Sequence, residues 1–451
     1  MLDLTTIERT LHTLFTTEAA HLARQSGLVR RHSKLTGPLL LLILVAGFIQ
    51  HPTASYNILA QVVADYGVTV TRQAIQTRLT APAVAFFHTL LQRSVELLQQ
   101  QVRLPIPLLT QFQAVYLLDS TQVALPAPLA ATYPGTGGAG PPAGIKWQVL
   151  WEILAGNLRA VCGQPAKQSD QRAMVDLPPL AAGSLLLCDL GYVALRLLST
   201  LIAQQVYFIC RWNPRFEAFT RAGRRLDLPA HLGRGAKDWL DMQLCVGVAQ
   251  HLPLRVVAGR VPLQVREQRR RRAHATEKKR GFTYSQAYLQ GLDWNIYITN
   301  VGPEQLSGPQ VWQVYGARWQ IELLFKLWKS EGALAQVRGQ QSSRVLCELY
   351  AKLIGLAVFG YLSAPVRWAA MELSPVKAWQ VWQRQIECVA QALRSGAGLA
   401  AILTQLYHRW QQFGCKEHRA DRPSSYQALQ RQPLCNPFAR LTASATQSVA
   451  G

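Results

Sequence analysis

The sequence contains few acidic residues. Its 451 residues include 25 Asp and Glu against 47 Lys and Arg, which gives a formal net charge of +22 at pH 7. An excess of positive charge on this scale favours polyanionic partners, either nucleic acid or an anionic membrane surface. Charge alone does not choose between the two. The hydrophobic share of 49% is sufficient for at least one large core, and the length predicts two or three domains.

Long apolar runs are also missing. The best candidate, Gly37–Ile49, is 13 residues long and follows three basic residues. A membrane-spanning helix needs about 20 apolar residues, so this run predicts a buried core helix and no membrane partner. The first residues lack the basic-then-apolar pattern of a signal peptide. A protein that binds a membrane surface through residues 30–49 is the alternative.

No cysteines are paired in a CxxC motif. The eight cysteines are scattered along the chain, which argues against a zinc ribbon. Cys415 and His418 lie close in the sequence, but no second pair with ligand spacing is near them. We interpret the cysteines as reduced thiols of a cytosolic protein.

Residues 1–105 have helical patterns. Leu59–Tyr66 and Arg72–Leu79 outline a helix-turn-helix, with Thr71 as the N-cap of its second helix. Such a second helix could enter the major groove of DNA. Two amphipathic helices packed on a neighbouring domain would show the same pattern, so both interpretations stay open.

Residues from 106 onward change to short apolar runs that predict strands. These runs are Ala114–Leu118, Lys146–Ile153, Ser184–Cys188, Val206–Cys210 and Trp294–Thr299. The Gly/Pro-rich loop 134–142 lacks the lysine of a P-loop and predicts no nucleotide site. Helical patterns return from about residue 343, and the small polar tail 441–451 predicts disorder.

Two aspartates follow buried strands in the same way. Asp119 and Asp189 each come after four apolar residues, at the point where a strand would reach the surface. If the strands are neighbours, the two carboxylates meet at one edge of a sheet, and Glu322 on an adjacent helix would complete the cluster. Hard oxygen ligands suit Mg²⁺ or Mn²⁺, and two such ions about 3.5–4 Å apart can activate one oxygen and stabilise another. The alternatives are turn or cap aspartates, and a surface ion pair of Glu322 with Lys326.

Glu322 also belongs to a second pattern. Tyr315, Arg318, Glu322 and Lys329 are spaced so that, at about 100° per residue, they fall within roughly 60° on one helix face. A carboxylate beside cations and a phenol suits an anionic substrate held next to a metal ion.

These motifs resemble those of the IS4-family DDE transposases of bacterial insertion sequences. The family signature is the Y-x2-R-x3-E-x6-K spacing of Tyr315, Arg318, Glu322 and Lys329. Asp119 followed by two hydroxyl residues resembles the first catalytic motif, and the turn Asp189–Tyr192 resembles the second. Leu190 departs from the pattern, because relatives often have Arg there and Leu cannot bind a phosphate. The resemblance covers residues 50–362.

The resemblance implies an α/β fold with an RNase H-like catalytic core, a mixed sheet flanked by helices. A β-rich insertion at about 206–300 interrupts the core, since 133 residues separate Asp189 from Glu322 against 70 between the two aspartates. We expect a helical DNA-binding region at 1–105, the catalytic domain at 106–362, and a helical C-terminal region at 363–451 that could dimerise. Asp119, Asp189 and Glu322 would be the catalytic residues and the ligands of two Mg²⁺ or Mn²⁺ ions.

The resemblance also assigns roles to basic and aromatic residues. Tyr315, Arg318, Lys326 and Lys329 would contact phosphates, and Trp294 would stack on a flipped base, as in relatives that cut through a DNA hairpin. Two basic runs could follow the DNA backbone: Arg269, Arg270, Arg271 and Arg272, and Lys278 to Arg280. The alternatives are a core tryptophan and a solvated charged helix.

The function implied is DNA transposition. The protein would bind the inverted-repeat ends of its element and catalyse metal-dependent cleavage and strand transfer in the bacterial cytoplasm, at the nucleoid. Double-stranded DNA and a second copy of the chain would be its partners. The alternative is a catalytically inactive DNA-binding repressor derived from a transposase.

Overall fold

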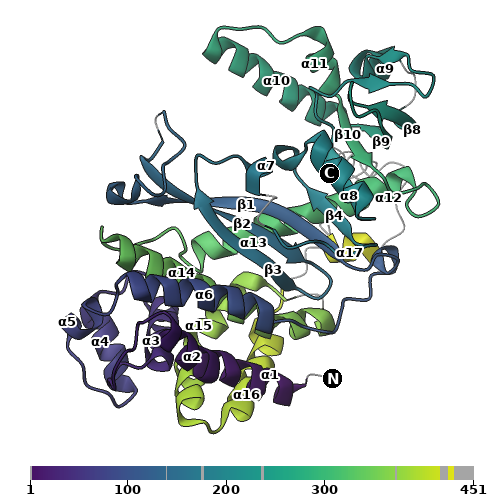
Figure 1. Cartoon of the computed structure of the whole chain (residues 1–451). Helices are drawn as coiled ribbons and strands as arrows, with labels where there is room; N and C mark the ends of the chain where they lie inside the picture. Colours follow the sequence, from purple (N-terminus) through teal and green to yellow (C-terminus); the bar gives the residue numbers. More distant parts are fainter. Residues whose placement is uncertain are drawn as a thin grey trace, which may run out of the picture. The chain divides into compact units, whose positions relative to one another are not determined.

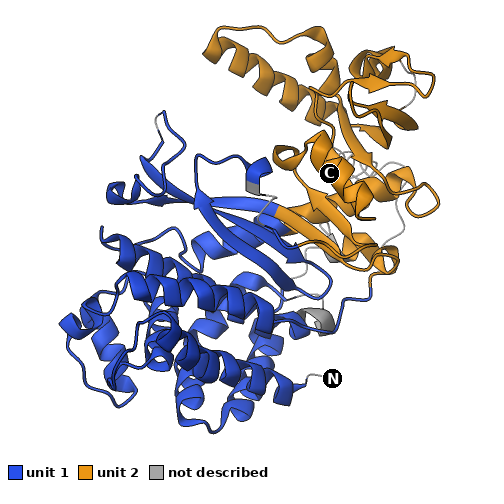
Figure 2. Ribbon diagram, in the orientation of Figure 1, with its two compact units in different colours: residues 1–105, 119–178, 321–422 blue, residues 106–118, 179–320, 423–451 orange. Residues whose placement is uncertain are grey.

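The computed structural model describes residues 3–138, 140–173, 177–234, 238–370, 373–416 and 425–430 (Figure 1). The predicted disordered tail and Cys435 lie outside the described residues. The chain falls into two compact units (Figure 2). Unit 1 comprises residues 1–105, 119–178 and 321–422, and unit 2 comprises 106–118, 179–320 and 423–451. Both units combine distant parts of the sequence, so this division differs from the predicted sequence ranges.

Ten strands form one hydrogen-bonded sheet in the order β3-β2-β1-β4-β5-β10-β9-β8-β6-β7. β4 is parallel to both β1 and β5, and β3 is antiparallel to β2. The sequence does not predict β3, because Gly163 and Pro165 interrupt its apolar pattern. The first five strands are β1 (Val115–Leu125), β2 (Ala143–Glu152), β3 (Asn157–Pro165), β4 (Leu185–Cys188) and β5 (Tyr207–Arg211). Short helices α7 (Asp170–Ala173) and α8 (Leu195–Ala203) follow β3 and β4.

The segment between β5 and β10 continues the sheet with antiparallel strands, as expected of a β-rich insertion. Its strands are β6 (Ala218–Phe219), β7 (Arg225–Leu226), β8 (Trp239–Val246) and β9 (Leu252–Arg260), and it ends at β10 (Trp294–Thr299). It also contains α9 (Leu228–Arg234), α10 (Leu263–Arg280) and α11 (Gln286–Gly291). Ala273 is the one buried residue of α10. The helix is therefore stabilised mainly by the high helix propensity of its Arg, Lys, Glu and Gln residues and not by a buried apolar face. Gly281 ends it in the left-handed conformation, at a φ of 68°.

Unit 1 contains a helical layer built from both ends of the chain. α3 packs against α4, α14 and α15, and α6 packs against α14. The N-terminal helices are α1 (Leu4–His12), α2 (Ala19–Gln25), α3 (Gly37–Gln50), α4 (Tyr56–Asp65), α5 (Arg72–Gln76) and α6 (Ala81–Leu97), with a π-helical turn at Thr13–Glu18. The C-terminal helices are α14 (Ser342–Ala370), α15 (Pro375–Ser395) and α16 (Leu399–Phe413). In unit 2, α17 (Ser425–Gln430) ends the described chain.

The apolar run near the N-terminus is a core helix, as predicted. Thr36 caps α3 by accepting from the Leu39 backbone N–H at 3.3 Å, and Pro38 occupies its first turn. Twelve of its residues are buried. Ser342–Val366 of α14 is long and apolar enough to cross a membrane. However, 89% of its most apolar stretch is buried inside the structure, as in the core helix of a globular protein.

The predicted helix-turn-helix outline corresponds to α4 and α5, which contact each other. Thr71 is the N-cap of α5, as predicted, and its Oγ1 accepts from the Ala74 backbone N–H at 3.2 Å. The second helix ends at Gln76 instead of Leu79, so it is three residues shorter than predicted. Its Ile75 is buried whereas Arg72 and Gln73 are exposed, so α5 has one packed side and one open side.

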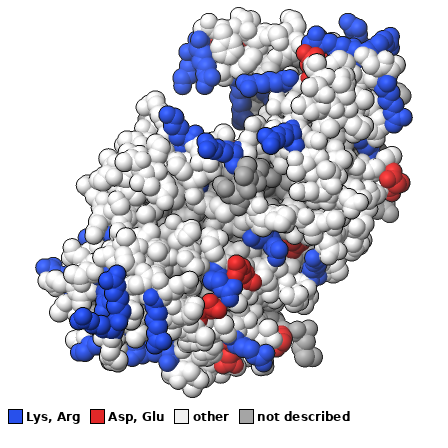
Figure 3. Space-filling model, viewed as in Figure 1, with Lys and Arg blue, Asp and Glu red and all other residues white. Residues whose placement is uncertain are grey.

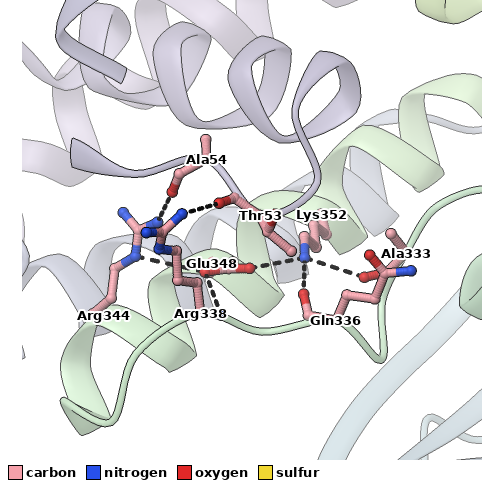
Figure 4. A network of polar contacts seen from close by, with 8 residues as sticks. All are labelled: Thr53, Ala54, Ala333, Gln336, Arg338, Arg344, Glu348 and Lys352. Atoms are coloured by element: carbon pink, nitrogen blue, oxygen red, sulfur yellow. Dashed lines mark hydrogen bonds and ion pairs between the residues drawn. The ribbon is translucent and has the colours of Figure 1, made fainter. Parts of the chain in front are cut away.

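A buried ionic network stabilises the N-terminal part of α14 (Figure 4). Arg344, Glu348 and Lys352 follow one another at i, i+4 spacing, and all three are buried. Glu348 accepts from Lys352 Nζ at 2.8 Å and lies 3.5 Å from Arg344 Nε. Burial raises the pKa of Glu348 and lowers that of Lys352, because each charge loses hydration, while the opposite charge of the partner counters both shifts.

The same network connects segments that are distant in sequence. Lys352 Nζ donates to the carbonyl oxygen of Ala333 at 3.1 Å, in the connection after α13 (Trp319–Ser330). Arg344 donates to the carbonyl oxygen of Ala54 at 2.7 Å and lies over the rings of Phe48 and Tyr56. The network therefore ties both the connection that follows the Glu322 helix and the turn before α4 to α14.

Candidate active site

Asp119 lies inside β1. The sequence predicts that the strand ends there, which is wrong, because β1 continues to Leu125. What changes at this position is burial: Val115–Leu118 are all buried, and from Asp119 onward buried residues alternate with more exposed ones. The paired register with β4 also stops at Leu118. The carboxylate thus occurs where the strand comes to the surface, and its Oδ1 accepts from the Ser120 backbone N–H at 2.8 Å.

Asp189 directly follows β4. Cys188, the last residue of this strand, pairs in parallel register with Leu118, so each aspartate comes immediately after one member of the same residue pair. Asp189 occupies the N-cap position of a short 3₁₀ turn, Leu190–Tyr192, but its side chain makes no capping hydrogen bond. The Asp189 carboxylate therefore does not cap this turn, which was the alternative interpretation of this residue.

The residues of the Y-R-E-K spacing do not share one continuous α-helix. Tyr315 ends α12 (Gly308–Tyr315), residues Gly316–Arg318 form a 3₁₀ turn, and Glu322 and Lys329 lie on α13. The expected arc of roughly 60° assumes 3.6 residues per turn throughout. A 3₁₀ turn has about 3.0 residues per turn and places positions i and i+3 one above the other, so this turn keeps Tyr315 and Arg318 on one side. The common face of all four residues stays a prediction.

Tyr315 is buried beneath the second aspartate. Its hydroxyl donates to the carbonyl oxygen of Cys188 at 3.3 Å, one residue before Asp189. Its ring contacts that of Tyr297, with centroids 4.6 Å apart, and the Arg318 guanidinium lies 6.0 Å from its ring centroid. Burial raises the pKa of Tyr315 far above its usual value, so the phenol stays neutral and can donate. The side chain is built to hold the backbone that carries Asp189.

Glu322 lies in the first turn of α13, where the positive end of the helix dipole stabilises a carboxylate. It is partly exposed, and Lys326 and Lys329 are exposed further along the helix. Partial burial lowers the pKa of Lys329. The intervening Phe325 and Trp328 are buried, so the apolar positions of α13 fix the direction of its charged side chains.

Among the residues that the structure describes, no three His, Cys, Asp or Glu side chains are grouped closely enough to hold a metal ion. Asp119 and Glu322 belong to unit 1, and Asp189 belongs to unit 2. Their carboxylate oxygens are the donors that Mg²⁺ and Mn²⁺ prefer, so the donor chemistry fits such ions. The three-carboxylate metal site stays a prediction.

A polar cluster beside Asp119 is missed by the sequence interpretation. Asp170 Oδ1 accepts from Ser120 Oγ at 3.1 Å, Lys146 Nζ at 3.0 Å and Gln148 Nε2 at 2.9 Å. Lys146 and Gln148 are both buried on β2. A lysine buried within an apolar strand requires a partner of opposite charge. The position of Lys146 in such a strand is thus the signal in the sequence that points to this cluster. The cluster holds the β1 residue that follows Asp119.

Trp294 is buried at the start of β10, with the Arg260 guanidinium 5.5 Å from its ring centroid. It also lines a cavity of about 560 Å³ that lies entirely within unit 2. The other lining residues include Arg211, Trp212 and Tyr288. Trp294 is therefore a packed strand residue, as in the alternative interpretation, that still borders an open space.

The profile of the transposase DDE domain family matches residues 110–357, which include all three carboxylates and the complete Y-R-E-K spacing. The chain belongs to the DDE transposase family. The transposase of insertion sequence element IS231E from Bacillus thuringiensis subsp. finitimus is 28% identical to it over 91% of each chain. The transposase of IS1151 from Clostridium perfringens is 25% identical over 82% of this chain and 85% of its own. The resemblance to IS4-family DDE transposases of insertion sequences is thereby confirmed.

The fold of this transposase agrees with its family. The order β3-β2-β1-β4-β5, with β1, β4 and β5 parallel, is that of an RNase H-like core, so the predicted fold class is confirmed. Among solved structures, the piggyBac transposase in a synaptic complex with hairpin DNA resembles the chain with a TM-score of 0.46 and 10% identity. That similarity covers 88% of this chain and 85% of the other.

The arginine run of the transposase, Arg269 to Arg272, contains two kinds of side chain. Arg269 Nη1 donates to the carbonyl oxygens of Leu292 and Trp294, both at 3.1 Å, and burial lowers the pKa of this guanidinium. Arg270 forms an ion pair with the buried Asp293 at 2.7 Å. Arg270 is still 48% exposed, whereas Arg271 is 82% exposed and pairs within α10, with Glu267 at 3.5 Å. Arg272 is exposed as well. The first two arginines attach α10 to β10, and only the last two present most of their charge to solvent.

We expect these two pairs of arginines to respond differently to substitution. Arg269→Ala should destabilise the transposase by about 1–3 kcal/mol, because it leaves buried carbonyl groups without their donor. The double variant Arg271→Ala/Arg272→Ala should fold normally and bind DNA more weakly. The slope of the logarithm of its binding constant against the logarithm of salt concentration should become shallower by roughly 1 for each phosphate that the variant no longer neutralises. Thermal unfolding and DNA-binding anisotropy across a salt series measure the two effects. Equal destabilisation by both variants would contradict this division of roles.

Proposed function

We propose that this transposase binds the inverted-repeat ends of its own insertion sequence, cleaves DNA there and joins the released ends to target DNA. The register of Leu118 with Cys188 supports this most directly, because it brings the residues just before Asp119 and Asp189 into one pair. Parallel strands paired in register bring the residues that come after a paired position close together, and Asp119 and Asp189 come after this pair. Family membership supports the same chemistry.

In this proposal Asp119, Asp189 and Glu322 hold two Mg²⁺ or Mn²⁺ ions. When bound, such ions activate an attacking oxygen and stabilise the leaving one. Arg318, Lys326 and Lys329 bind the phosphates around the cleaved bond, a role that suits the exposure of the two lysines. Tyr315 has a different role from the phosphate binding that its motif predicts, since its hydroxyl fixes the backbone before Asp189.

The cavity beside Trp294 suits an unpaired base. Aromatic and guanidinium groups line it, and its volume of about 560 Å³ is in the usual range of small-molecule sites. We propose that it accepts a base flipped out of the duplex near the cleaved bond, in keeping with the role that the resemblance implies for Trp294.

Further parts of the proposal concern assembly on DNA. The α4–α5 pair in the region 1–105 recognises the ends, and the exposed cations of α10 follow the phosphate backbone. Joining two ends requires two active sites, so we propose a homodimer on DNA to which residues 363–451 contribute. The protein would act in the bacterial cytoplasm at the nucleoid.

Labelled inverted-repeat DNA of the element tests this function. With Mg²⁺ the purified protein should cut the strand to release a 3′-OH and then form joined products. Removal of the metal with EDTA should abolish cleavage and leave end binding intact, because phosphate contacts by Lys and Arg need no metal. Binding without any cleavage in Mg²⁺ or Mn²⁺ would instead identify a DNA-binding repressor.

A further inference from the structure

An exposed group of aromatic side chains lies at the turn between α10 and α11. We call Phe282, Tyr284 and Tyr288 the aromatic surface. The rings of Tyr284 and Tyr288 stack with centroids 4.1 Å apart and planes 14° apart, and Phe282 meets Tyr284 edge-on at 4.8 Å. Phe282 and Tyr288 remain 41% and 38% exposed. Large apolar groups gathered at the surface in this way indicate an interaction site.

Local hydrogen bonds hold the aromatic surface in place. The Tyr284 backbone N–H donates to Glu277 Oε1 at 2.6 Å, and Glu277 Oε2 lies 2.7 Å from His274 Nδ1. Ser285 caps α11, and its Oγ accepts from the Tyr288 backbone N–H at 3.2 Å. The turn is therefore tied at both ends, so little ordering of the rings would be required on binding.

Positive charge borders the aromatic surface. Lys278, Lys279 and Arg280 form the exposed end of α10, and Gly281 alone separates them from Phe282. Figure 3 shows Lys and Arg side chains over the part of the surface that α10 forms. Stacked aromatic rings beside exposed cations fit a ligand that offers flat bases and phosphates at short intervals.

The aromatic surface continues into the cavity of unit 2. Tyr288 belongs to both, because it also lines the cavity together with Trp212, Trp294, Arg211 and Arg269. A strand that lay on the surface would thus have its next base at the rim of this cavity.

We propose that the aromatic surface binds an unpaired DNA strand, with bases stacked on Phe282 and Tyr288 and phosphates paired with Lys278 to Arg280. Base pairs in intact duplex hide the faces of their bases, whereas unpaired bases expose them for stacking. The inference rests on the proposed function, since a transposase that cuts both strands at an end must handle unpaired nucleotides there. A negatively charged protein partner is the competing occupant, and it would not require flat bases.

Binding of a labelled oligothymidine of about 12 nucleotides to the full-length protein tests this proposal. In EDTA, Phe282→Ala/Tyr288→Ala should weaken oligothymidine binding about 30-fold or more, because the loss of each stacked base weakens binding by at least about 5-fold and the variant removes two stacking rings. Binding to double-stranded inverted-repeat DNA should change little. Tyr288→Phe should retain the wild-type affinity, since a phenyl ring still stacks. Phe413→Ala is the matched control, because Phe413 is a comparably exposed aromatic residue, at 57%, in unit 1.

Two further results decide against the proposal. Equal weakening of single-stranded and double-stranded binding would assign the surface to backbone contact, and unchanged oligothymidine binding would remove DNA as its ligand. Unfolding of the alanine variant is checked by thermal melting, and Phe282→Ser alone then serves as the milder variant with the same expected direction. Because the assay uses no metal and no cleavage, a negative result here is distinct from a failure of the transposition assay.

Discussion

Glu322→Gln is expected to abolish DNA cleavage while end binding persists. The substitution keeps the size of the side chain and removes the negative charge through which a carboxylate holds a divalent metal ion strongly. We expect the rate of strand cleavage in Mg²⁺ to fall on the order of 10³-fold or more, as when a group that stabilises the transition state is removed. Single-turnover cleavage of labelled ends measures the rate, and a gel-shift assay with the same DNA measures binding.

Glu331→Gln provides the matched control for this variant. Glu331 directly follows α13, so it is a carboxylate near the same helix without a proposed catalytic role. Its substitution should leave cleavage close to the wild-type rate. If Glu322→Gln also cleaves at the wild-type rate, Glu322 is not a catalytic ligand, and α13 is only an amphipathic element of the fold.

Lys352→Met should have the largest effect on stability. Lys352 Nζ neutralises the buried Glu348 and donates to the carbonyl oxygen of Ala333. Removing one partner of a buried ion pair destabilises a protein by about 3–5 kcal/mol, and here Glu348 would keep the longer of its ion-pair contacts, with Arg344 at 3.5 Å. For a protein unit of this size we expect the melting temperature to fall by about 6–20 °C. Thermal unfolding followed by circular dichroism measures the change.

Two comparison variants make this experiment specific. Lys34→Met replaces an exposed lysine of unit 1 and should change the melting temperature little. Glu348→Leu/Lys352→Met removes both charges and should recover only part of the lost stability, because no carboxylate then lacks its lysine but the buried Arg344 loses its ion-pair partner. A Lys352→Met protein as stable as the wild type would show that Lys352 is not needed to compensate Glu348, whose charge Arg344 alone would then balance.

Much of the architecture can be predicted from local sequence patterns. The apolar runs before Asp119 and Asp189 correctly predict β1 and β4, because a strand buried on both faces needs consecutive apolar residues. Thr71 predicts the start of α5, since its side chain acts on its own backbone neighbourhood. The end of α5 at Gln76 is less predictable, because Leu79 beyond it is as buried as Ile75 within it and so continues the apolar pattern.

The candidate site shows where local patterns fail. Tyr315 belongs to the motif by spacing, yet it is buried, and its hydroxyl donates to the Cys188 carbonyl oxygen inside the protein. Arg269 and Arg271 are indistinguishable in a run of four arginines. Their different roles arise because β10 and its preceding turn present carbonyl groups to Arg269.

The sequence by itself determined the family, the core strands β1, β2, β4 and β5, and the identity of the residues proposed for catalysis, because residue type, spacing and apolar periodicity are local properties. Tertiary structure alone decided which charged and aromatic residues are accessible. It buried Arg344, Glu348 and Lys352 and left Phe282 and Tyr288 exposed. The physical reason is that burial and ion pairing depend on segments far apart in the chain, such as Ala54 and Arg344, whose contact no local pattern encodes.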